Sequence, residues 1–213
     1  MRKLFTILLL CCAVAMQAQN LKSLFIALPD SLSPLLTKVN RQDFGDFLES
    51  GMKAEVKNRF GNISEMKKLT NDYLSLQLTS VSRIEMKLLP LNDSTKVICV
   101  AKTFNGPVAD TQLAFYSTDW EKMDSEEFIK LPQKEAFFLP QTNQVRKDSL
   151  EYLKSRADIH LVKAALSEKD YFLNLTYTVP EYLDEETAGK IRTYLHNSPL
   201  RYQWQAGKFV EMK

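Results

Sequence analysis

The sequence predicts an α+β fold in which antiparallel β-sheet packs with a few helices. Apolar and polar residues alternate with a period of two in several segments, which is typical of strands with one buried face. Other segments carry apolar residues three and four positions apart, as amphipathic helices do. The links between neighbouring strands are too short for the crossovers of parallel strands, so the sheet should be antiparallel.

The first 18 residues have the features of a signal peptide. Two basic residues follow the initial methionine, and an apolar run then covers residues 4–16. This run is shorter than the roughly 20 apolar residues that span a membrane, so the protein is not expected to be membrane-spanning. Cleavage is expected after Ala18, with Ala15 as the alternative. Residues 19–213 then form an exported domain, in the periplasm or associated with the outer membrane.

A lipid anchor is the alternative interpretation of the same segment. The run Leu8-Leu9-Leu10-Cys11 has the leucine and the cysteine of a lipid-attachment site. A lipid-attachment motif, however, requires a small residue directly before the cysteine, and this sequence has Leu10 at that position. Cys11 and Cys12 are therefore interpreted as ordinary members of the apolar run, with lipidation as the alternative.

The exported domain has no net charge. Of 28 Lys and Arg residues, two lie in the signal peptide, which leaves 26 basic residues against 26 acidic ones. Such a domain lacks the excess positive charge expected of a nucleic-acid binder. Cys99 is its one cysteine, so an internal disulfide is excluded, and the apolar segment 96–101 around it predicts a buried thiol.

Two helices are expected before the first strand. Ser33 and Pro34 resemble an N-cap followed by proline at the first helical position, which predicts a short helix through Leu36. A second helix is expected over residues 41–51, where apolar residues follow at helical spacing after a capping pattern at Asn40.

A meander of four strands follows these helices. The period of two covers residues 73–78 and 83–88, and further strands are expected over 95–104 and 111–117. The third strand is apolar on both sides for several residues, so it should lie centrally in the sheet.

Residues 119–143 are less regular and are the expected divide between two halves of the chain. Within them, residues 135–139 are an apolar segment between two prolines, interpreted as a short strand or an apolar anchor. The elements expected next are a helix over 144–156, strands over 159–166 and 171–179, a helix over 185–196, and a hairpin over 201–205 and 208–212. A helix followed by antiparallel strands thus occurs twice, which leaves open a fold of two helix-plus-sheet halves.

No catalytic, cofactor-binding or metal-binding residue is predicted, and no cofactor is implied. The two histidines have no second histidine within helical reach, and there is no Cys-x-x-Cys pair. His160 is expected in a core or edge position of a strand. His196 is expected in the last turn of a helix, where positive charge suits the helix dipole. The acidic residues around Asp184 crowd a helix start, so their expected role is capping.

Tyr202 and Trp204 are the candidate partner surface. Aromatic residues gather late in the chain, between positions 171 and 209. Some of them alternate on strands and must be core. An exposed subset would suit a ligand or partner because aromatic side chains dominate binding hot spots, and the closing hairpin is the expected place for it.

Several stretches, spread over nearly the whole exported domain, are similar to one known family. They are Ala27-Leu28-Pro29-Asp30-Ser31-Leu32 with the following Pro34-Leu35-Leu36, the segment Met86–Val100, the pair Asp119-Trp120, and Tyr202-x-Trp204. In these stretches the sequence resembles an uncharacterised family of exported Bacteroidales proteins, a domain of unknown function. The resemblance implies a compartment and a lineage, and it carries no activity or site residue.

The function class expected from these observations is a non-catalytic binding or assembly module of the cell envelope. Its partner would be an envelope protein or a glycan, and not nucleic acid. The alternative is an envelope hydrolase that uses carboxylates together with His160. A cleft holding two converging carboxylates would favour the hydrolase.

Overall fold

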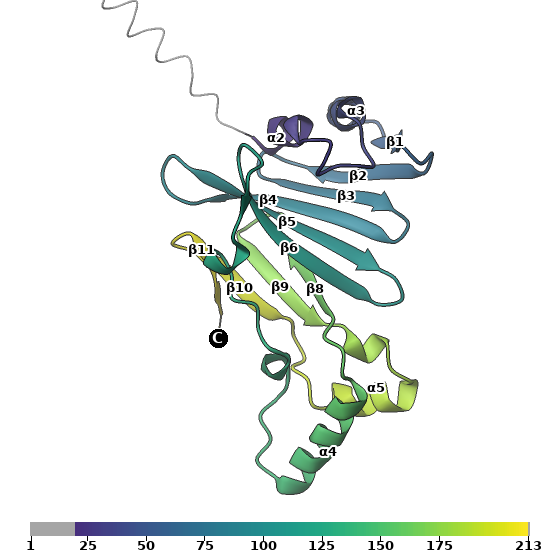
Figure 1. The fold of residues 1–213 in the computed structure, drawn as a ribbon, viewed down its shortest axis with the longest axis vertical. Coiled ribbons are helices and arrows are strands. Elements are labelled where there is room, and N and C mark those ends of the chain that lie inside the picture. The colour runs from purple at the N-terminus through teal and green to yellow at the C-terminus, as the bar shows by residue number, and fades with distance from the viewer. Residues whose placement is uncertain (1–19, 213) are drawn as a thin grey trace, which may run out of the picture.

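A computed structural model describes residues 20–212, so the predicted signal peptide, its cleavage sites and the alternative anchor at Cys11 lie outside the described residues. Two antiparallel sheets lie one against the other, with helices at both ends of the molecule (Figure 1). The α+β class with antiparallel sheets is therefore confirmed. Within residues 20–212, no helix is both long and apolar enough to cross a membrane.

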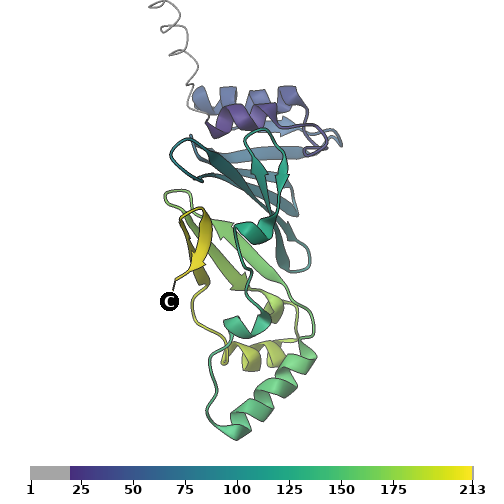
Figure 2. The same cartoon turned by 60° about the vertical axis from the view of Figure 1, so that its left-hand side comes forward.

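Two helices, α2 (Leu21–Ala27) and α3 (Lys38–Glu49), lie side by side on one face of the first sheet (Figure 2). The second begins before the predicted range 41–51, because Thr37 and Asn40 form a capping box with both hydrogen bonds at 3.1 Å. Helix α2 has no counterpart in the sequence prediction.

The short helix predicted from Ser33 to Leu36 is wrong, because this segment forms turns. The N–H of Leu36 donates to the Ser33 carbonyl at 3.2 Å, which closes a turn. The Leu36 carbonyl then accepts a hydrogen bond from the Arg41 guanidinium at 2.9 Å. A side chain of α3 thus takes the acceptor that a continuing helix would have used.

The first sheet is a seven-stranded meander in which each strand pairs with the next one in the chain. Its strands are β1 (Glu55–Lys57), β2 (Ile63–Leu69), β3 (Tyr73–Thr79), β4 (Ser82–Pro90), β5 (Lys96–Asn105), β6 (Ala109–Ser117) and β7 (Lys122–Met123). The four predicted strands are β3 to β6, and β5 is buried on both faces as predicted. Strand β2 has no counterpart in the prediction, because a register shift between Met66 and Lys68 interrupts its period of two.

The second sheet is built from the later part of the chain, in the order β11-β10-β9-β8. Its strands are β8 (Val162–Leu166), β9 (Phe172–Tyr177), β10 (Leu200–Gln205) and β11 (Lys208–Glu211). The same part of the chain contains the helices α4 (Gln144–Arg156) and α5 (Glu185–Arg192). Short 3-10 helices occupy Ser125–Glu127, Lys134–Phe137 and Val179–Glu181. Helix α4 and the closing hairpin lie where the sequence predicts them.

Helix α5 ends at Arg192, earlier than the predicted residue 196. Leu195 instead pairs with Phe138 in an isolated β-bridge, and the N–H of His196 donates to the Phe137 carbonyl at 3.0 Å. His196 therefore lies beyond the helix, and the prediction that it occupies the last helical turn is wrong.

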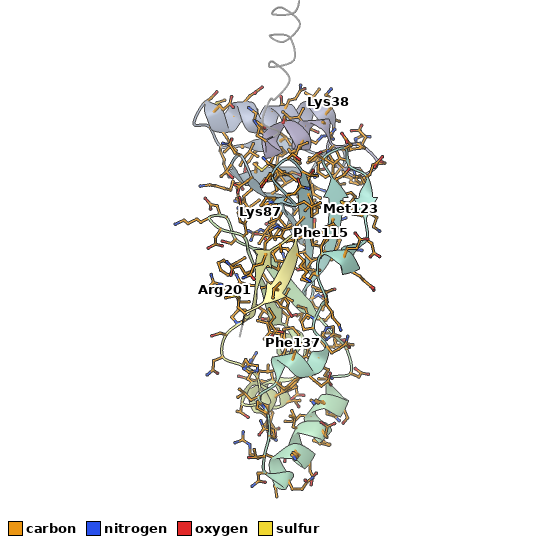
Figure 3. All side chains as sticks on the ribbon, turned by 90° about the vertical axis from the view of Figure 1, so that its left-hand side faces the viewer. Lys38, Lys87, Phe115, Met123, Phe137 and Arg201 are labelled. Carbon is orange, nitrogen blue, oxygen red and sulfur yellow. The ribbon has the colours of Figure 1, made fainter. Side chains whose placement is uncertain are left out.

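The two sheets share one hydrophobic core. Cys99 and Phe115 of the first sheet pack there with Leu173 and Leu175 of the second, and Figure 3 shows Phe115 where the two sheets meet. Burial also raises the pKa of the Cys99 thiol, so it remains protonated. Both buried phenylalanines of the predicted anchor 135–139 join this core. A division of the chain within residues 119–143 stays a prediction.

Polar side chains of the first sheet bind the outer edge of the second sheet. Alternate N–H groups of β8 donate to them instead of to another strand. These hydrogen bonds run from Val162 to Asp110 Oδ1 (3.0 Å), from Ala164 to Thr111 Oγ1 (3.0 Å) and from Leu166 to Glu85 Oε2 (3.3 Å). The angle and register between the sheets are thereby held by directional contacts as well as by the core.

Glu85 is buried between the sheets with its carboxylate fully engaged. One oxygen, Oε2, accepts the hydrogen bond from the Leu166 N–H. The other oxygen, Oε1, accepts hydrogen bonds from the Tyr73 hydroxyl and from Arg83 Nη2, both at 2.7 Å. Burial, and then the bond to Glu85, raises the pKa of Tyr73 to about 12. A buried carboxylate is tolerated only when it is paired and hydrogen-bonded, and these contacts meet that condition.

Asp184 is the N-cap of α5 and accepts a hydrogen bond from the Thr187 N–H at 2.9 Å. The predicted capping role of this acidic group is confirmed for Asp184. Because the carboxylate form accepts that bond, the pKa of Asp184 is held below its usual range.

Replacing Asp184 with alanine should therefore destabilise the protein at neutral pH, and progressively less in acid. A carboxyl whose pKa is depressed by folding adds stability that is complete above its unfolded pKa of about 4 and is lost as the pH falls through the folded-state pKa. Urea midpoints of wild type and Asp184→Ala over an acid-to-neutral series measure this difference. Asp184→Asn is the control, since it caps without titrating, and a pH-independent difference between wild type and Asp184→Ala would contradict the account.

Candidate functional site

A cavity of about 320 Å³ lies between the first sheet and the segment 28–36 that connects α2 to α3. Its volume is at the lower end of the roughly 300 to 1,000 Å³ typical of ligand pockets. Aliphatic and aromatic side chains form most of its lining. Among the described residues that line it, Lys102 is the one charged side chain, and Ser31, Ser33 and Gln112 are neutral and polar.

The floor of the cavity consists of cross-strand rows on the face of β4, β5 and β6. Strand pairing places one row near the β5–β6 turn and the next row deeper in the sheet. The first row is Ile84, Lys102 and Gln112, and the second is Met86, Val100 and Ala114. Polar side chains thus occur at one end of the floor, while the deeper row is apolar throughout. The small side chain of Ala114 contributes to the free space.

The roof of the cavity is the turn segment 28–36. Leu28 and Leu36 are buried, whereas Leu32 is 40% exposed, so the roof reaches from the core to the surface. A continuous helix would present one regular apolar stripe to the sheet. The turns instead leave a gap above the strands, which is the cavity.

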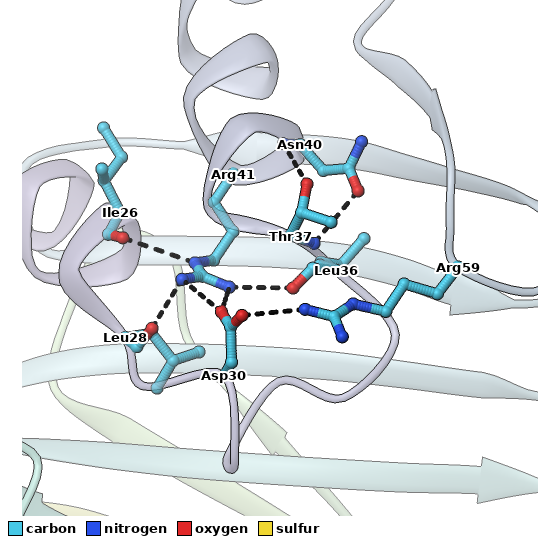
Figure 4. A network of polar contacts seen from close by, with 8 residues as sticks. All are labelled: Ile26, Leu28, Asp30, Leu36, Thr37, Asn40, Arg41 and Arg59. Atoms are coloured by element: carbon cyan, nitrogen blue, oxygen red, sulfur yellow. Dashed lines mark hydrogen bonds and ion pairs between the residues drawn. The ribbon is translucent and has the colours of Figure 1, made fainter.

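The guanidinium of Arg41 holds both ends of the roof (Figure 4). This side chain is 2% exposed and donates to the carbonyls of Leu28 at 2.6 Å and Leu36 at 2.9 Å. It also donates to Asp30 Oδ1 at 3.1 Å and to the Ile26 carbonyl at 3.4 Å. A single residue of α3 therefore satisfies several carbonyls of a segment without regular secondary structure.

Arg59 adds a second, more exposed attachment to the roof (Figure 4). The Arg59 guanidinium lies 2.8 Å from Asp30 Oδ2, and the backbone N–H of Arg59 donates to the Leu35 carbonyl at 2.9 Å. Asp30 thus bridges Arg41 and Arg59, which come from α3 and from the β1–β2 connection. These contacts give the roof a defined position over the sheet.

Trp120 lines the cavity from the β6–β7 turn. Its backbone has a φ of 65°, a conformation that bulky residues rarely adopt. Its indole N–H donates to the Leu24 carbonyl of α2 at 3.0 Å, and its ring centroid lies 5.8 Å from that of Tyr116. The side chain therefore ties the β6–β7 turn to α2 beside the cavity.

The structure places Tyr202 and Trp204 inside the molecule, 4% and 7% exposed. The Trp204 ring packs against Phe128 and Phe209, with ring centroids 6.1 and 5.0 Å away, and its indole N–H donates to the Pro90 carbonyl at 2.6 Å. Burial leaves little of either ring for a partner to contact. A partner surface at these two residues stays a prediction.

The histidines and the acidic residues do not form a site together in the described structure. His160 is exposed, precedes β8 rather than lying on it, and has its ring centroid 6.2 Å from that of Phe137. Asp184 is engaged as a helix cap. Between residues 20 and 212, no group of three or more His, Cys, Asp or Glu side chains is arranged to hold a metal ion.

The cavity was not predicted from the sequence. One signal for it is Lys102, a charged residue that directly follows the apolar run of the central strand and lies on the same face as Ile98 and Val100. A second is Gln112, which is directly opposite Lys102 on β6. Neither signal identifies a cavity by itself, because the roof is held by contacts from distant residues, chiefly Arg41.

Comparison with known families shows what the chain is related to. The family model described as "Protein of unknown function (DUF3256)" matches residues 13–209. The chain belongs to this family. The resemblance to an uncharacterised family is thereby confirmed, while the export of this DUF3256 chain stays a prediction.

A solved structure of a domain of an uncharacterized protein from Porphyromonas gingivalis is similar to this DUF3256 chain. The two are 30% identical and superpose with a TM-score of 0.80, over 90% of this chain and 97% of the other. None of the curated proteins compared with the chain matches it. These comparisons support the lineage and the fold, and they carry no activity.

Proposed function

We propose that this DUF3256 chain is an exported, non-catalytic binding protein of the cell envelope, and that it holds the apolar part of a ligand in the cavity beneath residues 28–36. The cavity is the observation that carries the proposal. It combines a ligand-sized volume, a mostly apolar lining and a roof held in place by Arg41.

Transfer of apolar groups into such a cavity is the main driving force expected for binding. Each buried methylene group contributes about 0.8 kcal/mol, so a chain of about eight methylenes contributes roughly 6 kcal/mol before the entropic cost of association. A micromolar complex requires a net free energy of about 8 kcal/mol, so the polar contacts of the ligand must contribute in addition to this burial.

The lining also argues for binding rather than hydrolysis. None of the described residues that line the cavity is an aspartate or a glutamate, so the cavity offers no pair of carboxylates for acid–base chemistry. The envelope location is motivated by the N-terminal signal, and an envelope protein or glycan as macromolecular partner belongs to the same proposal.

Filling the cavity should weaken ligand binding. The Ala114→Phe variant places a ring in the deeper floor row, and we expect the affinity for the uncharged fluorescent dye N-phenyl-1-naphthylamine to fall by at least about tenfold. The measurement is a fluorescence titration of the exported domain, residues 19–213, with thermal unfolding run in parallel to show that the variant is folded.

Ala165→Phe is the matched control. Ala165 is a half-buried alanine of a strand, as Ala114 is, but it lies in β8 and does not line the cavity. It should bind the dye as wild type does. Equal dye affinity of wild type and a folded Ala114→Phe protein would exclude the cavity as the binding site.

A further inference from the structure

The cavity floor changes from polar to apolar along a single direction. Pairing of β5 with β6 sets Lys102 opposite Gln112 in the outer row, and Val100 opposite Ala114 in the inner row. On the other side of β5, Ile84 and Met86 of β4 occupy the same two rows. A ligand that matches this floor has a polar group at one end and an apolar chain behind it.

Lys102 provides the charge at the polar end. Its ammonium lies 5.1 Å from the centroid of the Phe104 ring, on the next residue of the same strand face, which holds it near the outer row. Among residues 20–212, no carboxylate oxygen lies within 4.0 Å of the Lys102 ammonium, the limit for an ion pair. The arginines at the roof, by contrast, share Asp30. Lys102 is thus a half-buried cation with its donors open to a ligand.

We infer that the cavity binds a single-chain amphipathic carboxylate, with its head group between Lys102 and Gln112 and its chain over the inner row; this rests on the proposed function. An ammonium and an amide N–H can donate to the two oxygens of one carboxylate, and such charge-assisted hydrogen bonds are the stronger kind. The volume, at the lower end of ligand pockets, suits one apolar chain and not two.

An uncharged ligand with the same chain tests the role of the head group. The experiment measures the affinities of dodecanoate and dodecanol, both kept below micelle-forming concentrations, by displacement of N-phenyl-1-naphthylamine from residues 19–213. For Lys102→Met, which keeps an apolar stem of similar length, we expect dodecanoate to bind about tenfold more weakly and dodecanol to be almost unaffected. Lys102→Arg should restore most of the dodecanoate affinity.

Lys163→Met is the matched control, because Lys163 is an exposed lysine on β8 outside the cavity lining. It should leave both affinities at the wild-type level. If Lys102→Met lost equal affinity for dodecanoate and dodecanol, or lost affinity for neither, the inference would be overturned while the cavity remained a binding site. Failure of wild type to bind dodecanoate, although the dye binds and Ala114→Phe weakens that binding, would also overturn it. Absence of dye binding removes the proposed function itself, and the inference with it.

Discussion

Replacing Trp204 with alanine is expected to lower the free energy of unfolding by about 3 to 5 kcal/mol, the range for truncating a buried tryptophan in a core. The ring is 7% exposed and packs in the cluster with Phe128 and Phe209 that joins the two sheets. Its indole N–H is also lost, which leaves the Pro90 carbonyl without the 2.6 Å hydrogen bond. Urea unfolding followed by circular dichroism measures the change.

Gln205→Ala is the control for the Trp204 variant. It changes the next residue on the same strand, at an exposed position, and should shift stability by less than about 0.5 kcal/mol. If Trp204→Ala kept wild-type stability and instead lost an envelope partner in cross-linking, the packing role would be contradicted and the partner surface supported.

Replacing Arg41 with methionine is expected to lower the free energy of unfolding by about 2 to 6 kcal/mol. The variant keeps an apolar stem in place but leaves the carbonyls of Leu28 and Leu36 without partners, at about 1 to 3 kcal/mol for each buried unsatisfied group. Because the roof segment is held by these contacts, the affinity for N-phenyl-1-naphthylamine should fall as well.

Arg59→Met separates the buried attachment from the exposed one. The Arg59 and Asp30 side chains are 45% and 55% exposed, so their ion pair should contribute no more than about 1 kcal/mol. Denaturation midpoints and dye titrations of both variants provide the comparison. Equal effects of the two substitutions would show that burial of the Arg41 guanidinium is not what holds the roof.

Elements with local signals could be predicted from the sequence. Helix α4 begins directly after its N-cap Asn143, and the closing hairpin turns at Ala206-Gly207, where both residues have positive φ. The amino acids that cap or turn the chain are adjacent to the elements that they delimit, so their effect needs no knowledge of the rest of the fold. The capping aspartate of α5 belongs to the same class.

Elements whose form depends on distant contacts could not be predicted in this way. The turn at Ser33 looks like a helix start, but residues distant in the sequence, Arg41 and Arg59, bind the carbonyls of Leu36 and Leu35 that a helix would use. Strand β2 loses its alternating pattern at a bulge after Met66. The cavity requires the register of three strands and the position of the roof at once, so no single segment of sequence predicts it.

The side-chain contacts along β8 have a consequence for the protein's behaviour at high concentration. A strand edge with free N–H groups can pair with another molecule and so begin aggregation. Here the outward N–H groups of β8 are already occupied by Asp110, Thr111 and Glu85, and on β11 the N–H of Phe209 donates to the Phe128 carbonyl. The terminal strands of the first sheet, β1 and β7, are three and two residues long. Edge-to-edge association through either sheet is therefore disfavoured.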